Sequence, residues 1–422
     1  MADYEPKAIP IARDYRYPSK WTKGLITKLF AASIQEGVLG LQFKDEIVEV
    51  GSGKYIATIA PPSFLRLIAL LLRPDYRIPS YYTRGYWCCE KGRLYDFLEL
   101  LITQKRSPLH AWFRFLDRNP IRDKVIYRLF PLKVKSSIAA HYNTLPDFMK
   151  LILGERLEYT CAFFDKYHTN LRDAQDNKID AVIRRLDVSK DQRVLDMGCG
   201  WGQIAEAVSQ RVGAKVTGIN ISDSQIRFAQ SNRSSSDVDF VLTDYESFHP
   251  SAKFDRIYSI GMLEHVGRGL LDNYFSKIYE LLAPQGRALG HCIVRRPLGS
   301  TNSWVGDQVF PGAYIAQLSE IVDGIDRSKL HVEKAFAHDR TNYYRTLLAW
   351  TDNFYRNEEH LKHILSGAVP RADVETILRI WEFYLHGSRL AFNQKNGYCY
   401  NVQIVLRRLE DAAGDGARAG SE

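Results

Sequence analysis

The sequence contains few cysteines: there are six in 422 residues, and none forms a C-x-x-C pair. This scarcity excludes a thiolate zinc site, because such sites draw on closely spaced cysteines. We assign no metal site. Cys88 and Cys89 are adjacent, and neighbouring cysteines are poorly placed to form a disulfide with each other. We therefore predict a reduced, cytoplasmic protein.

Long hydrophobic runs are also absent. The longest, Phe64–Leu72, contains Arg66 and is far shorter than the ~20 apolar residues that a membrane-spanning helix needs. The first residues contain neither the basic stretch nor the apolar stretch of a signal peptide. We therefore expect neither a membrane span nor a secretory leader.

Basic residues are concentrated in the N-terminal third. Residues 1–135 contain 23 Lys and Arg against 13 Asp and Glu, whereas the whole chain has a net charge of +8. A basic surface suits nucleic acid or an anionic membrane. No recognition helix, RNP-type strand or zinc-finger spacing is present, so we expect no nucleic-acid partner. We favour peripheral association with an anionic membrane; a basic solvated face without a partner is the alternative.

Residue patterns predict four segments along the chain. They are an α+β accessory domain (1–103), a basic linker (104–135), a catalytic domain (136–410) and a disordered tail (411–422). In the first segment we expect helices over Trp21–Gln35, Ser63–Arg73 and Arg93–Thr103, and strands over Leu39–Lys44, Ile47–Val50 and Tyr55–Ile59. These helices could face lipid, although an amphipathic helix more often packs on a core.

The stretch Val194–Gly202 has the sequence Val-Leu-Asp-Met-Gly-Cys-Gly-Trp-Gly. It joins a predicted buried strand, Arg193–Met197, to a predicted helix, Gln203–Arg211. Its three glycines are Gly198, Gly200 and Gly202. Glycines allow a sharp turn and let a ligand lie against bare backbone. A dinucleotide site would need its third glycine one position later, so the spacing favours S-adenosylmethionine (SAM).

Further strands alternate with helices after this stretch. The predicted strands are Lys215–Ile219, Val238–Thr243, Arg256–Ile260, Arg287–Val294 and Asn401–Arg407. This alternation predicts an α/β fold with a Rossmann-like, mostly parallel sheet. Residues 300–390 are expected to be mostly helical and to form a lid, and Pro284-Gln285-Gly286 is expected to close a helix. Ligands of such sheets bind beyond the carboxyl ends of the strands.

Several motifs occur in one order from about His141 to Arg407. The chain has Asp-Met-Gly-Cys-Gly-Trp-Gly from Asp196, Ile-Asn-Ile-Ser-x-x-Gln from Ile219, and Leu-Glu-His-Val-Gly from Leu263. It also has Tyr159–Phe164, His-Cys-Ile from His291, Phe-Pro-Gly from Phe310 and Tyr-x-Arg-Thr-Leu from Tyr343. This set resembles the cyclopropane-fatty-acyl-phospholipid synthases and mycolic acid cyclopropane synthases, which are SAM-dependent methyltransferases.

The candidate cofactor residues follow the predicted strands or the motifs of this family. They are Tyr142, Gly198, Gly200, Trp201, Gly202, Asn220, Ile221, Gln225, Asp244, Tyr245 and Ile260. Asn220 stands where many SAM-binding folds have an acid that bonds the ribose hydroxyls, so we expect Asn220 and Gln225 to share that task. We expect Asp244 and Tyr245 to face the adenine. Trp201 could instead be a core residue.

The resemblance implies a reaction on lipid. The SAM methyl carbon is transferred to the cis double bond of an unsaturated phospholipid acyl chain, and loss of a proton closes a cyclopropane ring. In the family the proton acceptor is thought to be bound bicarbonate. By motif, its ligands fall on Glu264, His291, Tyr343, and backbone groups near Cys161 and Ile293. Imidazole, phenol and N–H groups suit an anion, and a carboxylate can accept from the bicarbonate hydroxyl.

Other interpretations of these residues and of the function stay open. Glu264 could cap a helix or pair with a lysine, and His291 and Tyr343 could be packing residues. The chain also departs from the family at Leu145-Pro146 and at Ser388, which indicates a divergent member. The product could instead be a methyl- or methylene-branched chain. A small-molecule methyltransferase or a non-enzymatic lipid-binding scaffold are further alternatives, and the family implies a homodimer.

Overall fold

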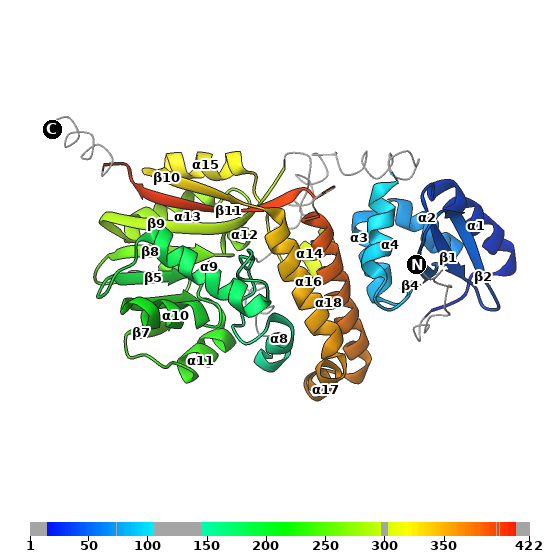
Figure 1. Ribbon diagram of the computed structural model, residues 1–422, viewed down its shortest axis with the longest axis horizontal. Coiled ribbons are helices and arrows are strands. Elements are labelled where there is room, and N and C mark those ends of the chain that lie inside the picture. Colours follow the sequence, from blue (N-terminus) through cyan, green and yellow to red (C-terminus); the bar gives the residue numbers. More distant parts are fainter. Residues whose placement is uncertain are drawn as a thin grey trace. The chain divides into compact units, whose positions relative to one another are not determined.

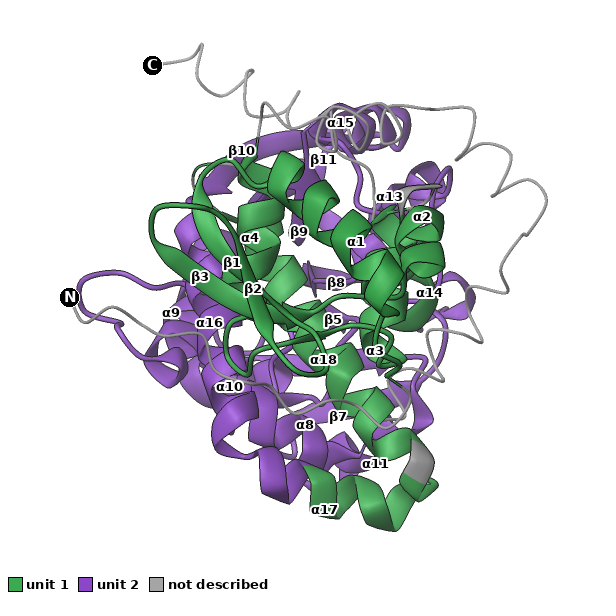
Figure 2. Ribbon diagram, turned by 90° about the vertical axis from the view of Figure 1, so that its right-hand side faces the viewer, with its two compact units in different colours: residues 1–131, 302–309, 362–397 green, residues 132–301, 310–361, 398–422 purple. Residues whose placement is uncertain are grey.

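The computed structural model describes residues 15–72, 74–104, 145–296, 303–393, 395 and 397–410. The chain divides into two compact units (Figure 2). Unit 1 comprises residues 1–131, 302–309 and 362–397, and unit 2 comprises residues 132–301, 310–361 and 398–422. Neither unit is contiguous in sequence, in contrast to the linear segments that we expected. Tyr142, the predicted linker beyond Gln104, and the predicted tail lie outside the described residues.

Unit 1 contains a four-stranded sheet with the order β2-β1-β3-β4 (Figure 1). The strands are β1 (Gly37–Gln42), β2 (Ile47–Ser52), β3 (Tyr55–Ala60) and β4 (Cys88–Cys89). Strands β1 and β2 are antiparallel, and β1 and β3 are parallel. The end of β2 requires glycine: Gly51 has φ +91°, and a Cβ there would lie 2.2 Å from the Gly37 carbonyl oxygen.

Helices from three parts of the sequence complete unit 1. They are α1 (Lys20–Ser33), α2 (Phe64–Leu72), α3 (Pro74–Thr83), α4 (Leu94–Thr103), α14 (Ser303–Gln308) and α18 (Arg371–Ala391). α18 packs on α3 and α4. The Tyr82 hydroxyl donates to Glu382 at 2.5 Å, and Asn393 Nδ2 donates to the Tyr95 hydroxyl at 2.8 Å. These bonds tie late residues of the chain to its N-terminal part.

Unit 2 is built on a seven-stranded sheet with the order β10-β11-β9-β8-β5-β6-β7. The strands are β5 (Arg193–Met197), β6 (Lys215–Asn220), β7 (Val238–Leu242), β8 (Phe254–Ile260), β9 (Leu282–Arg295), β10 (Leu330–His338) and β11 (Cys399–Arg408). The pairs from β9 to β7 are parallel, whereas β11 pairs antiparallel with β9 and β10. The predicted α/β fold with a mostly parallel sheet is confirmed.

Helices cover both faces of this sheet. The elements of unit 2 are α8 (Pro146–Leu153), α9 (Leu171–Leu186), α10 (Gln203–Val212), α11 (Asp223–Ser231), the 3₁₀ turn η1 (Tyr245–Ser247), α12 (Leu263–Val266), α13 (Leu271–Leu281), α15 (Leu318–Arg327) and α16 (Arg340–Arg356); α17 (Glu358–Ala368) spans the boundary with unit 1. One core packs α13 and α15 on the sheet, and the other packs α9, α10 and α11. Successive β5 residues alternate between the two: Val194 joins the second core, and Leu195 joins the first.

Two details of the predicted secondary structure are wrong. Residues 300–390 contain β10, which we did not expect, because a register shift between Val332 and Lys334 interrupts the alternation that marks a strand. Pro284-Gln285-Gly286 lies inside β9 instead of closing a helix. Gln285 adopts φ +60° there, a conformation that is unusual for a non-glycine residue. Among the described helices, none is long and apolar enough to cross a membrane.

Candidate cofactor and catalytic site

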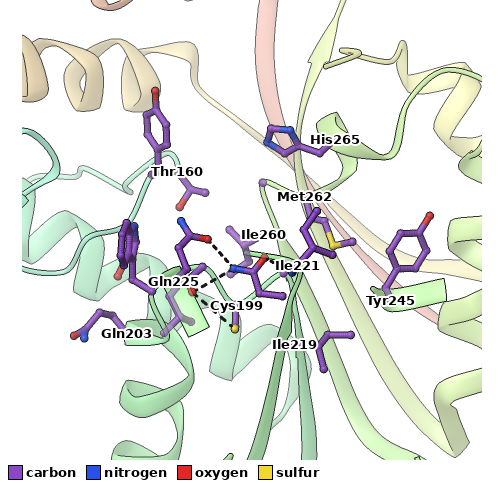
Figure 3. Close-up of a pocket in the computed structure, with 18 of the residues that line it drawn as sticks. Thr160, Cys199, Gln203, Ile219, Ile221, Gln225, Tyr245, Ile260, Met262 and His265 are labelled. Carbon is purple, nitrogen blue, oxygen red and sulfur yellow. Dashed lines mark hydrogen bonds between the residues drawn. The ribbon is translucent and has the colours of Figure 1, made fainter. Parts of the chain in front are cut away.

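A cavity of about 660 Å³ opens at the carboxyl ends of the parallel strands of unit 2 (Figure 3). The segment before α9, the glycine turn after β5, and the residues after β6, β7 and β8 supply its walls. The lining includes nine of the eleven predicted cofactor residues: Gly198, Gly200, Trp201, Asn220, Ile221, Gln225, Asp244, Tyr245 and Ile260. This is the sheet edge at which ligands of open α/β sheets bind.

The three glycines of the turn have different tasks. Gly200 has φ +53°, and a Cβ at this position would meet no protein atom within 4 Å, so its backbone is bare toward the cavity. Gly198 has φ +90°, and a Cβ there would press on the side chain of Met262. Gly202 does not line the cavity. A Cβ on Gly202 would lie 2.6 Å from the ring of Phe240, so this glycine is required for packing rather than for ligand contact.

Two amide side chains form part of the cavity wall: Asn220 ends β6, and Gln225 lies on α11. Asn220 Nδ2 donates to Gln225 Oε1 at 2.7 Å and to the Gly200 carbonyl at 3.4 Å. Asn220 Oδ1 accepts from the Ile221 N–H at 2.8 Å. These bonds connect the glycine turn, the end of β6 and α11. Asn220 and Gln225 therefore form one fixed polar group in the cavity wall, as their proposed shared role requires.

The part of the cavity wall that follows β7 is the 3₁₀ turn η1. Asp244 caps this turn by accepting from the Glu246 N–H at 3.0 Å. The buried Tyr245 ring lies edge-on to Tyr274, with ring centroids 5.8 Å apart. Burial raises the pKa of Tyr245, so its hydroxyl stays protonated at neutral pH. Trp201 both lines the cavity and packs edge-on against Phe228. The two roles expected for it, cofactor contact and core packing, are therefore compatible.

Other residues of the cavity wall were not among the predicted site residues. They include Arg156, Leu157, Glu158, Tyr159, Thr160, Cys199, Gln203, Met262 and His265. In Figure 3, Thr160 and His265 occupy the upper part of the view, and Tyr245 lies to the right. Residues 156–160 form an irregular segment, which carries no periodic pattern. Met262 and His265 follow β8, and this place after a strand could have indicated them; His265 also belongs to the motif from Leu263.

The five predicted catalytic residues do not line this cavity. All five belong to unit 2, and two of them, Cys161 and Glu264, lie next to lining residues along the chain. Cys161 follows Thr160, and Glu264 lies between Met262 and His265. Glu264, His291, Tyr343 and Cys161 are all buried. Cys161 and Glu264 therefore adjoin the cavity wall in sequence, and the four buried residues lie in a water-poor layer.

Glu264 is positioned by the end of a strand. β8 ends at Ile260, opposite His291, and β9 runs on beyond it. The Ile293 N–H, which faces the side that β8 has left, donates to Glu264 Oε1 at 2.6 Å. The resemblance implied that backbone groups near Ile293 hold the bicarbonate. Glu264 Oε2 is buried and has no hydrogen-bond partner among the described residues, and burial raises the pKa of Glu264 to about 7.

His291 lies on β9 between polar and aromatic neighbours. Its Nδ1 is 3.0 Å from Gln403 Nε2, and its Nε2 is 3.4 Å from Asn401 Nδ2, both on β11. The Phe163 ring stacks on it at a centroid distance of 5.6 Å. Burial, together with nearby His338, Lys178 and Arg185, lowers the pKa of His291 well below its usual value. The imidazole is therefore neutral at physiological pH.

Helix α16 holds the segment that carries Cys161. Thr346 Oγ1 accepts from the Ala162 N–H at 3.0 Å, and Asn342 Oδ1 accepts from the Phe164 N–H at 2.9 Å. Tyr343 lies on the same helix and is buried, with its ring edge-on to Trp350. Burial raises the pKa of Cys161 to about 12, which rules out a thiolate nucleophile at neutral pH.

A buried ion pair supports the same segment from the other side. Lys178 Nζ pairs with Glu158 and donates to Thr160 Oγ1 at 2.6 Å, and the Lys178 side chain has no exposed surface. A buried charge without a partner is strongly unfavourable, so the pair fixes Glu158 and Thr160 against α9. Thr160 is also packed on Gly261, where a Cβ would lie 2.6 Å from Thr160 Cγ2. Sequence reasoning did not find this pair.

The model of the mycolic acid cyclopropane synthetase family matches residues 132–402. The chain belongs to this family. Cyclopropane-fatty-acyl-phospholipid synthase of Escherichia coli is 28% identical over 86% of this chain and 90% of its own length. A probable fatty acid methyltransferase of Pseudomonas putida is 31% identical, and the match covers 61% of this chain and 66% of that protein. These relatives support a methyltransferase that acts on lipids.

Solved structures show the same fold. The cyclopropane synthase MmaA2 of Mycobacterium tuberculosis is 24% identical, covers 64% of this chain and 97% of its own, and has a TM-score of 0.58. Coclaurine N-methyltransferase is 19% identical, covers 81% of this chain and all of its own, and has a TM-score of 0.63. This member of the cyclopropane synthetase family is therefore a SAM-dependent methyltransferase by family and by fold.

The cavity of this family member fits SAM. The bare backbone of Gly200 leaves room for a ligand where any side chain would project, and the Asn220–Gln225 pair offers amide groups for hydroxyls. The rest of the lining is mainly apolar, which suits an adenine ring and a thioether chain. Tyr142, which was also predicted to approach the cofactor, lies outside the described residues.

Proposed function

We propose that this protein transfers the methyl carbon of SAM to the cis double bond of an unsaturated phospholipid acyl chain and forms a cyclopropane ring. One observation carries the proposal. A buried carboxyl with a raised pKa, Glu264, accepts from the Ile293 N–H, two residues along β9 from a buried neutral imidazole, His291. A small-molecule N- or C-methyltransferase has no need of a bicarbonate pocket, whereas ring closure needs a proton acceptor in a water-poor layer.

SAM, when bound, supplies an electrophilic methyl group, and bicarbonate, when bound, supplies a small base. Glu264 Oε2 fits a bicarbonate hydroxyl, because it is a buried acceptor without a partner among the described groups. His291, the Tyr343 hydroxyl and the Cys161 N–H are the donors that we assign to the anion. Glu264 already occupies the Ile293 N–H, so that group acts through Glu264. The apolar rings around these residues exclude water, which would otherwise quench a carbocation on the lipid.

Lipid analysis tests this function. The chain is produced in a host without its own cyclopropane synthase, and the phospholipid acyl chains are examined by mass spectrometry. We expect unsaturated chains to gain one CH₂ and to lose their double bond. The Glu264→Gln variant in the same host is the control. A gain of CH₂ with the alkene retained would instead establish a branching methyltransferase, and unchanged lipids despite SAM-binding protein would favour a small-molecule substrate or a non-enzymatic scaffold.

We further propose that unit 1 docks on an anionic membrane through α1 and α2. These helices pack against each other and expose large apolar side chains: Trp21 at 78%, Leu65 at 79%, and also Leu25 and Ile68. The exposed Lys20 and Lys28 lie on α1. Apolar side chains beside cations suit the interface of a membrane that contains acidic lipids. The homodimer that the family implies stays a prediction.

Vesicle binding checks this docking surface. The double variant Trp21→Asp/Leu65→Asp is expected to bind vesicles of phosphatidylglycerol and phosphatidylcholine at least about tenfold more weakly, because two apolar anchors become charged. Tyr167→Asp changes an equally exposed ring of unit 2 and is the matched control. Flotation with the vesicles measures the bound fraction. Equal binding by the double variant and the wild type would remove these helices from the contact.

A further inference from the structure

A buried polar chain leads from Arg185 to His291 in unit 2. Arg185, on α9, donates through Nη1 to Gln403 Oε1 on β11. Gln403 Nε2 lies 3.0 Å from His291 Nδ1 on β9. The side chains of Gln403 and His291 are buried, at 0% and 2% exposure. Gln403 and His291 are therefore closed to water and depend on each other as hydrogen-bond partners.

The chemistry of Arg185 fixes the direction of every bond in this chain. A guanidinium group has only donors, so the Gln403 atom that faces it must be the amide oxygen. The orientation of a glutamine amide is ordinarily ambiguous, but here the arginine removes the ambiguity. The amide nitrogen of Gln403 then donates to His291 Nδ1. An Nδ1 that accepts a hydrogen bond carries no proton.

We infer that Arg185, acting through Gln403, holds His291 as the neutral tautomer whose proton is on Nε2. The consequence for catalysis rests on the proposed function. His291 then donates a hydrogen bond to the bound bicarbonate, and it is not the group that removes the proton from the lipid. Arg185 and Gln403 are positioning residues, because neither is assigned to contact substrate.

The surroundings of His291 favour the neutral form from every side. The charged or titratable groups whose interactions reach it are His338, Lys178 and Arg185, and none of these is an anion. Arg185 Nη1 also lies 3.0 Å from His338 Nε2, so this nitrogen too must be an acceptor. Phe163 stacks on both imidazoles, at 4.1 Å from His338 and 5.6 Å from His291. Burial lowers the pKa of His338 to about 4.

Arg185 is itself held in place. Its guanidinium lies 4.0 Å from the centre of the Phe336 ring on β10 and 5.7 Å from that of Phe163. Such cation–π contacts orient an arginine without supplying a competing acceptor. The arginine is therefore free to direct its donors at Gln403 and His338. Strands β10 and β11, which lie outside the parallel part of the sheet, thus set the protonation of a residue on β9.

Nitrogen-15 NMR of histidine-labelled, full-length protein tests the tautomer without reference to activity. In the wild type we expect the His291 signals, assigned by their loss in His291→Gln, to show an unprotonated Nδ1 and a protonated Nε2. In Gln403→Glu the new carboxylate can only accept, so the proton should move to Nδ1. We expect kcat for lipid modification to fall by about 10- to 100-fold, with the SAM affinity unchanged.

Variants of the arginine complete the test. Arg185→Lys keeps a side chain that only donates and should retain the tautomer and much of the activity, whereas Arg185→Met should lose both. Arg184→Met, at an exposed arginine of the same helix, is the matched control and should behave as the wild type. A wild-type His291 with its proton on Nδ1, or an unchanged tautomer in Gln403→Glu, would overturn the inference. If the tautomer is as inferred and no lipid is modified, the proposed function alone fails.

Discussion

Replacing Glu264 with glutamine is expected to leave SAM affinity unchanged and to lower turnover on lipid by at least about 100-fold. Glutamine keeps an oxygen for the Ile293 N–H, which Glu264 Oε1 now accepts at 2.6 Å, so the end of β9 should keep its geometry. The variant loses the second carboxylate oxygen, which we assign to the bicarbonate hydroxyl. Calorimetric SAM titration and lipid turnover measure the two effects separately. Turnover at the wild-type rate would remove Glu264 from the mechanism.

The same variant is expected to unfold with a different pH dependence. Burial raises the folded-state pKa of Glu264 from 4.5 to about 7, so the folded protein binds this proton more tightly than the unfolded chain does. The wild-type free energy of unfolding therefore falls as the pH rises from about 4.5 to 7. At 1.36 kcal/mol per pKa unit, the loss between pH 5 and pH 8 is about 2–3 kcal/mol.

Urea unfolding of both proteins at pH 5 and pH 8 measures this effect. The glutamine side chain of the variant does not titrate, so Glu264→Gln should gain stability relative to the wild type as the pH rises. Glu49→Gln, at an exposed position on β2, is the control and should follow the wild type. Parallel pH profiles of wild type and Glu264→Gln would mean that Glu264 is not held in a water-poor layer.

Replacing Gly200 with valine is expected to weaken SAM binding by at least about 100-fold. A side chain at this position meets no protein atom within 4 Å and therefore projects into the cavity where the cofactor would lie. The fold should persist, because the space that valine enters is not part of a core. The left-handed backbone, with φ +53°, adds a strain of about 1–2 kcal/mol.

Gly92→Val separates the blocked cavity from the backbone strain. Gly92 has φ +78°, and a Cβ there also meets nothing within 4 Å, but it lies in unit 1 and does not line the cavity. Both variants should lose similar stability in thermal unfolding, whereas only Gly200→Val should lose SAM affinity by calorimetry. Undiminished affinity in Gly200→Val would refute the assignment of the glycine turn to the cofactor.

The sequence predicted the parallel part of unit 2 well, because local signals determine it. The strand Arg193–Met197 has the predicted bounds, and the residues after it form the cavity wall. Glycine spacing and strand alternation are short-range patterns, and parallel strands place their carboxyl ends at one edge without further information. Nine predicted cofactor residues therefore lie together in the structure.

The features that the sequence did not predict depend on contacts between distant residues. The buried pair of Lys178 with Glu158 joins a helix to an irregular segment, and nothing in either stretch alone indicates that both are buried. Strand β10 was missed because its alternation is broken by a shifted register. Gly202 was assigned to ligand contact, although only the position of Phe240 shows that it makes room for a ring.

Unit 1 is built from three separate stretches of the chain, and this affects recombination between related genes. A gene fragment that ends near residue 131 would encode α3 and α4 without Glu382 and Asn393, to which Tyr82 and Tyr95 are bonded. Exchange of residues 1–131 between relatives by a single crossover would therefore combine Tyr82 and Tyr95 of one parent with the α18 region of the other. All three stretches of unit 1 come from one parent only when the stretches of unit 2 between them do so as well. We therefore expect the sequences of unit 1 and unit 2 to diverge together.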